Sequence, residues 1–423
     1  MLDIRLIREK PDVVREALAR RKEHAPLDEL IRADIRRREL LTQTEGLQAE
    51  RKRVSKQVPR IKDQAERQQL IEEMRGVGDR IAELNRELVE AEEQVSRLLL
   101  EMPNLPDPQV PDGEDDSDNV LVRQSGEPRE LDFEAKPHWE LGEALGIINF
   151  EQGQRISGSR FYVLHGDGSR LQRALASWML DLHRRQGYQE VTVPYMVRRE
   201  TLRASAHLPD FENTMYELVG EDFWLIPTSE SPLTSLHAGE ILSAGDLPRQ
   251  YTSYSANFRR EQISAGRDVR GIKRGHQFDK VEMYHFTLPE DSEAALDRLT
   301  AHAEETCHLL GLTWRTVERC TGDLGFKNRR GYDVEVWSPG VREWLEVSST
   351  SNVGDFQARR AQVRFKREAG ARTEFAHTLN GTGLGMPRTM IAVLENYQQP
   401  DGSVVIPEAL RPYMGGQQRM ESG

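Results

Sequence analysis

The sequence predicts an α+β protein in which an antiparallel β-sheet domain flanked by helices follows an antiparallel two-helix coiled-coil arm. Apolar residues recur at heptad spacing in the first quarter of the chain, whereas alternating runs and helical segments succeed one another after Arg160. A segment rich in Pro, Asp and Gly separates the two patterns. We therefore expect a helical domain over 1–102 with its arm at about 27–100, a linker over 103–118, a sheet domain over 119–415 and a disordered tail over 416–423.

Two apolar seams predict the arm. In its second half the spacing alternates between four and three residues, through Leu70, Met74, Val77, Ile81, Leu84, Leu88, Ala91, Val95 and Leu98. In its first half Leu40, Leu47, Val54 and Ile61 recur every seven residues. Because Pro59 and a polar run up to Gln69 divide the seams, two helices of about 45 Å each should pack on each other in opposite directions.

The turn of this hairpin is basic, although the chain as a whole has a net charge of −12. Its cations, with no acid among them, are Arg51, Lys52, Arg53, Lys56, Arg60 and Lys62. Cations aligned on a helix can follow an RNA phosphate backbone. The alternative is an oligomerisation coiled coil whose charged end is only solvated.

The composition, with 30% charged and 37% hydrophobic residues, is that of a soluble protein. No apolar run approaches the ~20 residues of a membrane span, and the N-terminus, MLDIRLIREKPDVV, lacks the apolar core of a signal peptide. We therefore expect a cytoplasmic protein without a membrane partner. Cys307 and Cys320, with His302 and His308, lack the paired spacing of a zinc site, so no zinc is expected.

Apolar periodicity also predicts the elements of the second domain. Strands are expected at 120–123, 161–164, 188–197, 222–226, 314–320 and 332–352, the last interrupted by a turn at Ser338-Pro339-Gly340. Helices are expected at 137–151, 169–186 and 290–310. The helix at 169–186 should bury Leu171, Leu175, Trp178, Met179 and Leu182.

The most informative stretch is a hairpin with strands expected at 250–258 and 278–288. Its loop combines cations with glycines, namely Arg259, Arg260, Arg267, Arg270, Lys273 and Arg274 with Gly266, Gly271 and Gly275. Cations on a flexible backbone suit a polyanion. On the returning strand, Phe278, Lys280 and Glu282 should share one face, while Val281 and Met283 share the other. The alternative is a basic hairpin whose arginines only face solvent.

Three further positions suit a ligand site. Thr228 and Ser229 follow a short strand and are N-cap candidates for the next helix, which has Glu230 in its first turn. A glycine-rich turn leads into an amphipathic helix that begins near Arg388, and both features suit phosphate. Glu346 and Ser349 need a bulge between them to face one ion, because residues three apart on a regular strand point to opposite faces. Without a bulge, Glu346 is a solvated residue.

FRRE at 258–261 and FDKVEM at 278–283, with the basic loop between them, resemble motif 2 of the class II aminoacyl-tRNA synthetases. RDVRGIKRGHQFDKVEM is similar to the bacterial seryl-tRNA synthetase family in particular. The helix at 169–186, the next strand and Pro194 resemble motif 1, the homodimer interface of the class, although an ordinary αβ unit explains them equally well. FAHTLNGTGLGMPRTMIAVLENYQ resembles motif 3. The resemblance extends to about residue 400 and implies a class II catalytic domain with a tRNA-binding arm.

The resemblance implies ATP-dependent activation of L-serine to seryl-adenylate, with Mg²⁺, and transfer of serine to the 3′-terminal adenosine of tRNA(Ser). It makes Arg259, on the α-phosphate, and Arg388, on the γ-phosphate, the catalytic residues. It assigns ATP to Arg259, Arg260, Glu261, Phe278, Glu346, Val347, Ser348, Ser349 and Arg388, with Glu261 on the adenine amino group, Phe278 stacked on the ring, and Glu346 and Ser349 on Mg²⁺. It assigns serine to Thr228, Ser229, Glu230, Arg259, Glu282, Asn380 and Thr382, and tRNA to the six cations of the arm.

One departure and two alternatives accompany this hypothesis. Where many relatives have NGS, this chain has Asn380-Gly381-Thr382, which adds a methyl group in the serine pocket. The first alternative is a synthetase-like ligase that loads an amino acid onto a carrier protein, but its known relatives lack the long arm. The second is a non-catalytic tRNA-binding paralogue, which should have lost charged residues that all three motifs retain here. Charging of selenocysteine tRNA stays open.

Overall fold

The computed structural model describes residues 1–261 and 270–422, so the predicted Gly266 and Arg267 lie outside the described residues. The chain divides into two compact units, one of residues 1–19 and 23–103, the other of residues 20–22 and 104 to the C-terminus. No helix in the described ranges is long and apolar enough to cross a membrane.

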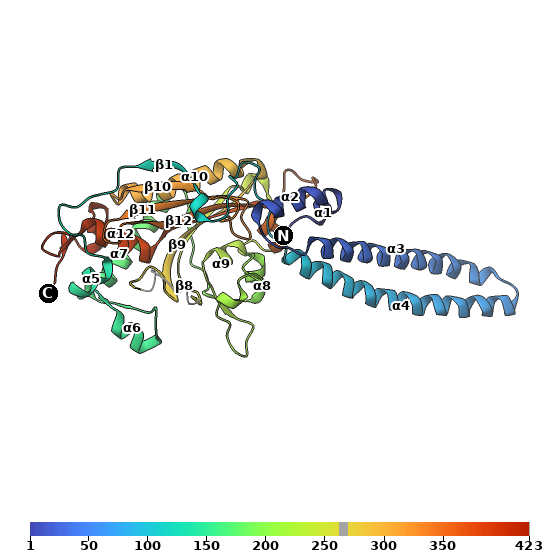
Figure 1. The fold of residues 1–423 in the computed structure, drawn as a ribbon. Helices are drawn as coiled ribbons and strands as arrows, with labels where there is room; N and C mark the ends of the chain where they lie inside the picture. The colour runs from blue at the N-terminus through green and yellow to red at the C-terminus, as the bar shows by residue number, and fades with distance from the viewer. Residues whose placement is uncertain (262–269, 423) are drawn as a thin grey trace. The chain divides into compact units, whose positions relative to one another are not determined.

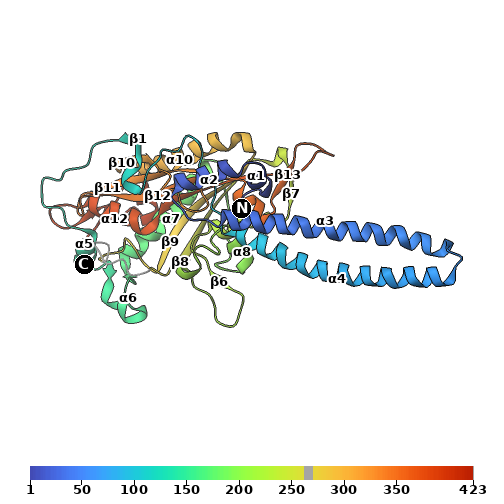
Figure 2. The ribbon, with the colours of Figure 1, turned by 45° about the vertical axis from the view of Figure 1, so that its right-hand side comes forward.

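The first unit is helical. Short helices α1 (Ile4–Glu9) and α2 (Pro11–Arg21) precede the long α3 (Leu27–Gln57) and α4 (Gln64–Leu100), which run side by side in opposite directions (Figure 2). Leu40, Leu84 and Ala91 are buried between the long helices. The predicted hairpin is confirmed. α4 begins earlier than its apolar seam, because Asp63 caps it by accepting hydrogen bonds from the backbone N–H groups of its first turn.

The second unit is built on an eight-stranded sheet in the order β1-β10-β11-β12-β15-β9-β8-β4. Figure 1 labels β1, β10, β11, β12, β9 and β8 of this sheet. The sheet is antiparallel except for the pair of β4 and β8, which confirms the predicted architecture. Its strands are β1 (Val120–Ser125), β4 (Gln189–Glu190), β8 (Arg249–Phe258), β9 (Gln277–Thr287), β10 (Trp314–Glu318), β11 (Arg330–Ser338), β12 (Glu343–Gly354) and β15 (His377–Gly385). β15 comes late in the chain and lies between β12 and β9, so segments far apart in the sequence become neighbours.

Helices α7 (Gly166–Arg185), α10 (Ser292–Leu309) and α12 (Met386–Tyr397) pack on one face of this sheet. The apolar residues predicted for α7 are all buried. On β9, Val281 and Met283 belong to this core. The alternate residues Lys280 and Glu282 therefore point to the opposite face, as predicted. That face carries the candidate site.

Smaller elements complete the second unit. They are η2 (Asp116–Asp118), β3 (Val163–Leu164), α8 (Arg199–Ala204), η3 (Glu212–Thr214), β6 (Trp224–Leu225), α9 (Glu230–Thr234), β7 (Ile241–Ser243), α11 (Phe356–Ala361), β13 (Arg364–Lys366), β14 (Glu374–Phe375) and η7 (Glu408–Met414). The strands expected at 161–164 and 222–226 are thus shorter than predicted.

Two local predictions are wrong. The helix expected at 137–151 is divided into α5 (His138–Ala144), β2 (Ile148–Asn149) and α6 (Phe150–Ser157). Gly146 takes a φ of 65° just after α5 and ends that helix. The strand expected at 188–197 is reduced to β4 and β5 (Met196–Val197), on either side of Pro194.

The predicted disordered tail is also wrong for residues 416–422. β17 (Arg419–Met420) pairs with β16 (Val404–Val405), and the Met420 side chain is fully buried. Met420 is the only apolar residue of this stretch, which polar contacts of Gln417 with Arg170 and Asp167 also hold, so its composition did not reveal the strand. Part of the expected linker is fixed as well, since the Asn104 side chain donates to the backbone oxygens of Lys327 at 2.9 Å and Val353 at 2.8 Å.

Candidate active site

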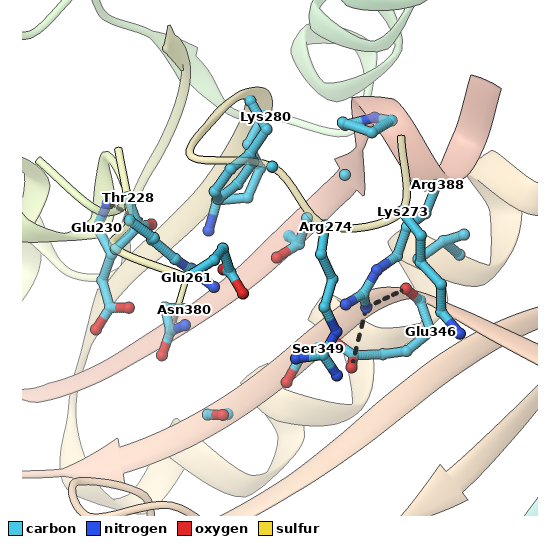
Figure 3. A pocket seen from close by; sticks show the side chains of 18 of the residues that line it. Thr228, Glu230, Glu261, Lys273, Arg274, Lys280, Glu346, Ser349, Asn380 and Arg388 are labelled. Carbon is cyan, nitrogen blue, oxygen red and sulfur yellow. Dashed lines mark hydrogen bonds and ion pairs between the residues drawn. The ribbon is translucent and has the colours of Figure 1, made fainter. Parts of the chain in front are cut away.

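A cavity of about 370 Å³ is lined by residues of β9, β12, β15, the β8–β9 connection and the start of α12. Figure 3 shows its two ends. Thr228, Glu230, Glu261, Lys280 and Asn380 lie at one end, and Lys273, Arg274, Glu346, Ser349 and Arg388 lie at the other. The second end combines three cations with oxygen donors, which is the chemistry that binds a metal-complexed polyphosphate.

Arg388 and Arg259 approach this cavity from different elements. Arg388 lies in the first turn of α12, donates to the backbone oxygen of Glu346 at 2.7 Å and contacts its carboxylate at 3.1 Å (Figure 3). Arg259 follows β8, donates from Nε to the oxygen of Pro227 at 3.3 Å and lies 4.9 Å above the Phe278 ring. Burial, with the charge of Arg388, lowers the pKa of Arg259, although its side chain stays open to the cavity. Two guanidinium groups and one carboxylate thus surround one space.

A bulge in β12 brings Glu346 and Ser349 to the same wall. In the pairing with β11, Val334 faces Ser348, whereas the next residue, Glu335, faces Glu346. Val347 is therefore the extra residue that the sequence required but could not locate. A carboxylate and a hydroxyl that flank a phosphate-sized space are donors that Mg²⁺ prefers, so these residues fit the ion. Among the described residues no group of three or more His, Cys, Asp or Glu could hold a metal.

Near the other end of the cavity, two buried side-chain oxygens lack a donor in the described part of the chain. Glu282 is fully buried behind the wall, where its Oε2 accepts from the Thr228 hydroxyl at 2.9 Å and contacts the Lys280 ammonium. Its Oε1, and Oδ1 of Asn380, are buried without a hydrogen-bond partner among the described residues. Asn380 lines the cavity, so a small ligand that donates through a hydroxyl or an ammonium group can satisfy its oxygen, whereas Glu282 contacts the cavity wall through Thr228 and Lys280.

Glu230, predicted to meet a substrate ammonium, already has two donors. Its Oε1 accepts from Gln357 Nε2 at 2.7 Å and contacts the Lys327 ammonium. Burial raises the pKa of Glu230, but the opposing field of Lys327 and its neighbours is stronger, so the net pKa lies below the ordinary value. The carboxylate therefore stays ionised.

The residues of the cavity wall that sequence reasoning did not single out include His207, Lys327, Asn328 and Ser351. Lys327 and Asn328 lie in the connection between β10 and β11, which has no periodic pattern. His207 lies between the hydroxyls of Ser205 and Ser231, at 2.9 Å and 3.1 Å, and burial lowers its pKa to about 3. In the sequence, a single histidine after a short helix does not indicate that it reaches the cavity.

Three predicted ligand residues lie outside the cavity wall. The Arg260 guanidinium is 5.2 Å above the Tyr216 ring, and the Ser348 hydroxyl donates to the oxygen of Thr382 at 2.5 Å. Ser229 is buried at the N-cap of α9, where the Thr228 hydroxyl, not its own, accepts from the Glu230 N–H. Their roles toward ATP or serine stay predictions. The other residues predicted to bind ATP or serine line the cavity, except Glu282.

The six cations predicted to bind tRNA all have exposed side chains at the turn of the helical hairpin. Four lie in the last turns of α3, one in the 3-10 turn Val58–Arg60 and one just before α4.

Comparisons with known proteins agree along the whole chain. Residues 1–106 match the family model described as the seryl-tRNA synthetase N-terminal domain, and residues 214–397 match the tRNA synthetase class II core domain (G, H, P, S and T). A protein of Roseiflexus sp. (strain RS-1) named serine–tRNA ligase is 60% identical over 417 residues, 98% of each chain. The chain belongs to the seryl-tRNA synthetase family. A relative of the same name from Chloroflexus aurantiacus is 58% identical over 421 residues, 99% of this chain and 100% of the relative.

Solved structures of this family have the same fold. The crystal structure of seryl-tRNA synthetase from Pyrococcus horikoshii complexed with ATP matches with a TM-score of 0.95 at 36% identity, over 100% of both chains. The cytoplasmic serine–tRNA ligase of Naegleria fowleri in complex with AMP matches with a TM-score of 0.88 at 31% identity, over 100% of this chain and 99% of that one. The class II synthetase fold predicted from the motifs is thereby confirmed.

Proposed function

We propose that the chain activates L-serine with ATP to seryl-adenylate and then transfers serine to the 3′-terminal adenosine of tRNA(Ser). One observation carries this proposal. Arg259, Arg388 and Glu346 meet around one cavity, beside buried acceptors that suit a small hydroxy amino acid. Membership of the seryl-tRNA synthetase family supports it, and does not support a carrier-protein ligase or a silent paralogue.

In the first step a serine carboxylate oxygen attacks the α-phosphorus of ATP, a new P–O bond forms, and pyrophosphate leaves with the electrons of the broken bond. Negative charge grows on the α-phosphate, where Arg259 would stabilise it, while Arg388 would hold the γ-phosphate. Mg²⁺ on Glu346 and Ser349 would neutralise phosphate charge. Such a reaction depends on position and electrostatics, because the protein forms no covalent bond with the substrates.

The adenine end of ATP would lie against Phe278, with Glu261 accepting from its amino group. Glu261 has a suitable position, since it lines the cavity and its Oε2 is 3.7 Å from a guanidinium nitrogen of Arg160, which limits its movement. Val347, which lines the cavity, and Arg260 and Ser348, which do not, would complete the predicted ATP set through backbone or indirect contacts.

Serine selection would rest on the unpaired acceptors. The serine hydroxyl and ammonium group would bind Asn380 and Glu230, assisted by Thr228 and Thr382. Glu282 would act from behind the wall by holding Thr228 and Lys280. Alanine would leave the acceptor of the serine hydroxyl unpaired, which in such sites costs about 10⁴-fold in specificity. Threonine would be excluded by size, and the methyl group of Thr382 makes the pocket smaller than a serine at this position would.

The helical hairpin would bind the tRNA. Its exposed cations suit a phosphate backbone, and binding should weaken as salt rises. tRNA(Ser) is the proposed partner, and the same contacts would admit tRNA(Sec) if it shares that shape. We also propose a homodimer through the α7 region, which resembles motif 1, and action in the cytoplasm, where translation takes place.

Serine-dependent ATP–pyrophosphate exchange tests the first step directly. Exchange should appear with serine and fall to background with alanine, threonine and glycine. A shortened chain that lacks residues 30–98 should keep this exchange but lose tRNA charging. Exchange with a different amino acid, or none with serine, would contradict the proposed activity, and light scattering of the intact chain would test the dimer.

A further inference from the structure

We infer that His138 is a positioning residue for adenylate formation, which holds the segment Gly271–Gly275 in place over the polyphosphate end of the cavity. No motif of the sequence pointed to this histidine, and it does not line the cavity. The inference rests on the proposed function for the task of Lys273 and Arg274, but its geometry is independent of that function.

His138 is the first residue of α5, and 2% of its surface is exposed. Its backbone N–H donates to Oε1 of Glu395 at 2.8 Å, and its ring Nδ1 lies 3.0 Å from the same oxygen. On the other side of the ring, Nε2 lies 3.2 Å from the backbone nitrogen of Ile272. The imidazole therefore bridges a carboxylate and the backbone of the β8–β9 connection.

These two partners fix the tautomer of the ring. A backbone N–H can only donate, so Nε2 must accept and carries no proton. The remaining proton is then on Nδ1, where the carboxylate of Glu395 accepts it. The ring is a neutral Nδ1–H imidazole, and either the other tautomer or the charged form would place a hydrogen between Nε2 and the Ile272 N–H.

Glu395 is a rigid anchor for this ring. It is fully buried in α12, and its Oε2 accepts from the Ser338 hydroxyl at 2.5 Å and from the backbone nitrogens of Gly340 at 2.9 Å and Val341 at 3.1 Å. With both donors from His138, five hydrogen bonds hold one carboxylate. Arg388 lies on the same helix, about two turns away, which is about 10 Å.

The segment that His138 holds forms part of the cavity wall. Ile272, Lys273, Arg274 and Gly275 all line the cavity. Gly271 has a φ of 81°, and a Cβ on it would lie 2.0 Å from Nε2 of His138, so glycine alone lets the backbone approach the ring. Lys273 is fixed from the other side by its contact with Glu343 of β12 at 2.7 Å. His138 thus joins the helix that carries Arg388 to the loop that carries Lys273 and Arg274.

Two substitutions separate the two hydrogen bonds of the ring. His138→Asn keeps a donor for Glu395 but is too short to reach the Ile272 N–H, whereas His138→Gln can present an oxygen to that N–H. In serine-dependent exchange, His138→Asn should lower kcat/KM for ATP on the order of 10- to 100-fold, because displaced phosphate contacts cost that much. KM for serine and Tm should change little, and His138→Gln should restore most of the loss. His377→Asn is the control and should behave as wild type. His377 does not line the cavity, and its ring contacts the Ser292 hydroxyl at 2.9 Å.

Gly271→Ala gives a second route to the same displacement, since it moves the loop and leaves Glu395 untouched. It should also raise KM for ATP and not KM for serine, and it decides the matter if His138→Asn does not fold. Equal kinetics in wild type, His138→Asn and Gly271→Ala would overturn the inference. So would a loss that affects serine and ATP equally, is not restored by His138→Gln and accompanies a lower Tm, because that marks a purely structural histidine.

A spectroscopic measurement does not depend on catalysis. In long-range ¹H–¹⁵N spectra of ¹⁵N-histidine-labelled protein, the resonances that vanish in His138→Asn should show the Nδ1–H tautomer, and a proton on Nε2 would overturn the inference. If wild type lacks serine-dependent exchange, the proposed function fails, while the tautomer and calorimetric ATP affinity of the variants still test His138.

Discussion

Glu346 and Ser349 line the same cavity wall because Val347, between them, is an extra residue of β12 relative to β11. The bulge interrupts the regular alternation of the strand, so the side-chain oxygens of both residues face the same space. It also places the carboxylate of Glu346 within 3.1 Å of the Arg388 guanidinium. One irregularity of the sheet thus connects the predicted ion to the predicted γ-phosphate contact.

If these two donors share one Mg²⁺, their substitutions should not be additive. Glu346→Gln and Ser349→Ala should each raise the Mg²⁺ concentration needed for half-maximal exchange, by about tenfold or more for the carboxylate. The double variant should need little more than Glu346→Gln alone. Glu374→Gln, on strand β14 and outside the cavity wall, is the control. Fully additive shifts would show that the two residues do not bind the same ion.

Arg259→Ala should reduce serine-dependent exchange by about 10³-fold or more, because it removes a cation from the site of growing charge. Thermal unfolding should change little, since within residues 1–261 and 270–422 the guanidinium donates one hydrogen bond, to the oxygen of Pro227 at 3.3 Å. Arg260→Ala should cost far less, because that guanidinium lies over Tyr216 outside the cavity wall. Equal losses in the two variants would contradict this assignment.

Lys327→Met should change the pH dependence of serine activation. Burial raises the pKa of Glu230 and Lys327 is the largest opposing influence, so its removal must raise that pKa. The acid limb of kcat/KM for serine should then move to higher pH, while the rate well above this limb stays the same. Lys366→Met, in β13, is a matched control that should leave the profile unchanged. An acid limb in the wild-type position would show that Glu230 does not bind the ammonium.

The cations of the hairpin turn should contribute to tRNA binding and not to serine activation. Replacing Arg51, Lys52 and Lys56 by Gln should raise KM for tRNA(Ser) and reduce the salt dependence of binding by about one unit of slope per lost contact. Exchange without tRNA should be unchanged. The matched control replaces Arg32, Arg38 and Arg86, which are exposed elsewhere on the same helices. If both triple variants weaken tRNA binding equally, the change in net charge causes the weaker binding, and the hairpin turn is not a specific tRNA site.

Met420→Ala should lower the free energy of unfolding by about 2–4 kcal/mol, because it removes a fully buried side chain that fixes β17. Glu421→Ala, next to it and exposed, should leave stability unchanged. Chemical denaturation measures both. A Met420→Ala protein as stable as wild type would mean that the C-terminal strand does not contribute to the fold.

The fold could be predicted where an apolar repeat extends over many residues or where a motif contains many characteristic residues. The heptads of α3 and α4, the buried face of α7 and the alternation of Lys280 and Val281 on β9 each follow from a repeat. Shorter elements depend on tertiary contacts. In β17 the Met420 side chain is buried in the folded protein, which the polar sequence around it does not indicate. Helices α5 and α6 separate at Gly146, whose positive φ is likewise visible only in the folded chain.

The candidate site was predictable only where residues belong to dense charged motifs. Arg259, Arg388 and Glu346 could be named, and the need for a bulge could be stated, but its position at Val347 is visible only in the strand pairing. Lys327 and His207 come from connections without a repeat, so nothing in the sequence indicates that they reach the cavity. His138 is more remote still, because it acts through the backbone of Ile272.

The place of β15 in the sheet has a consequence for synthesis of the chain. β15 lies between β12 and β9. A nascent chain that ends before His377 therefore has two partial sheets, and the edge strands β12 and β9 of these sheets are open. These open edges are the ones to which β15 pairs in the finished sheet, and unpaired edges recruit other strands. Chains that terminate prematurely in this region should therefore aggregate, and the nucleotide pocket comes into being only when the last tenth of the polypeptide has left the ribosome.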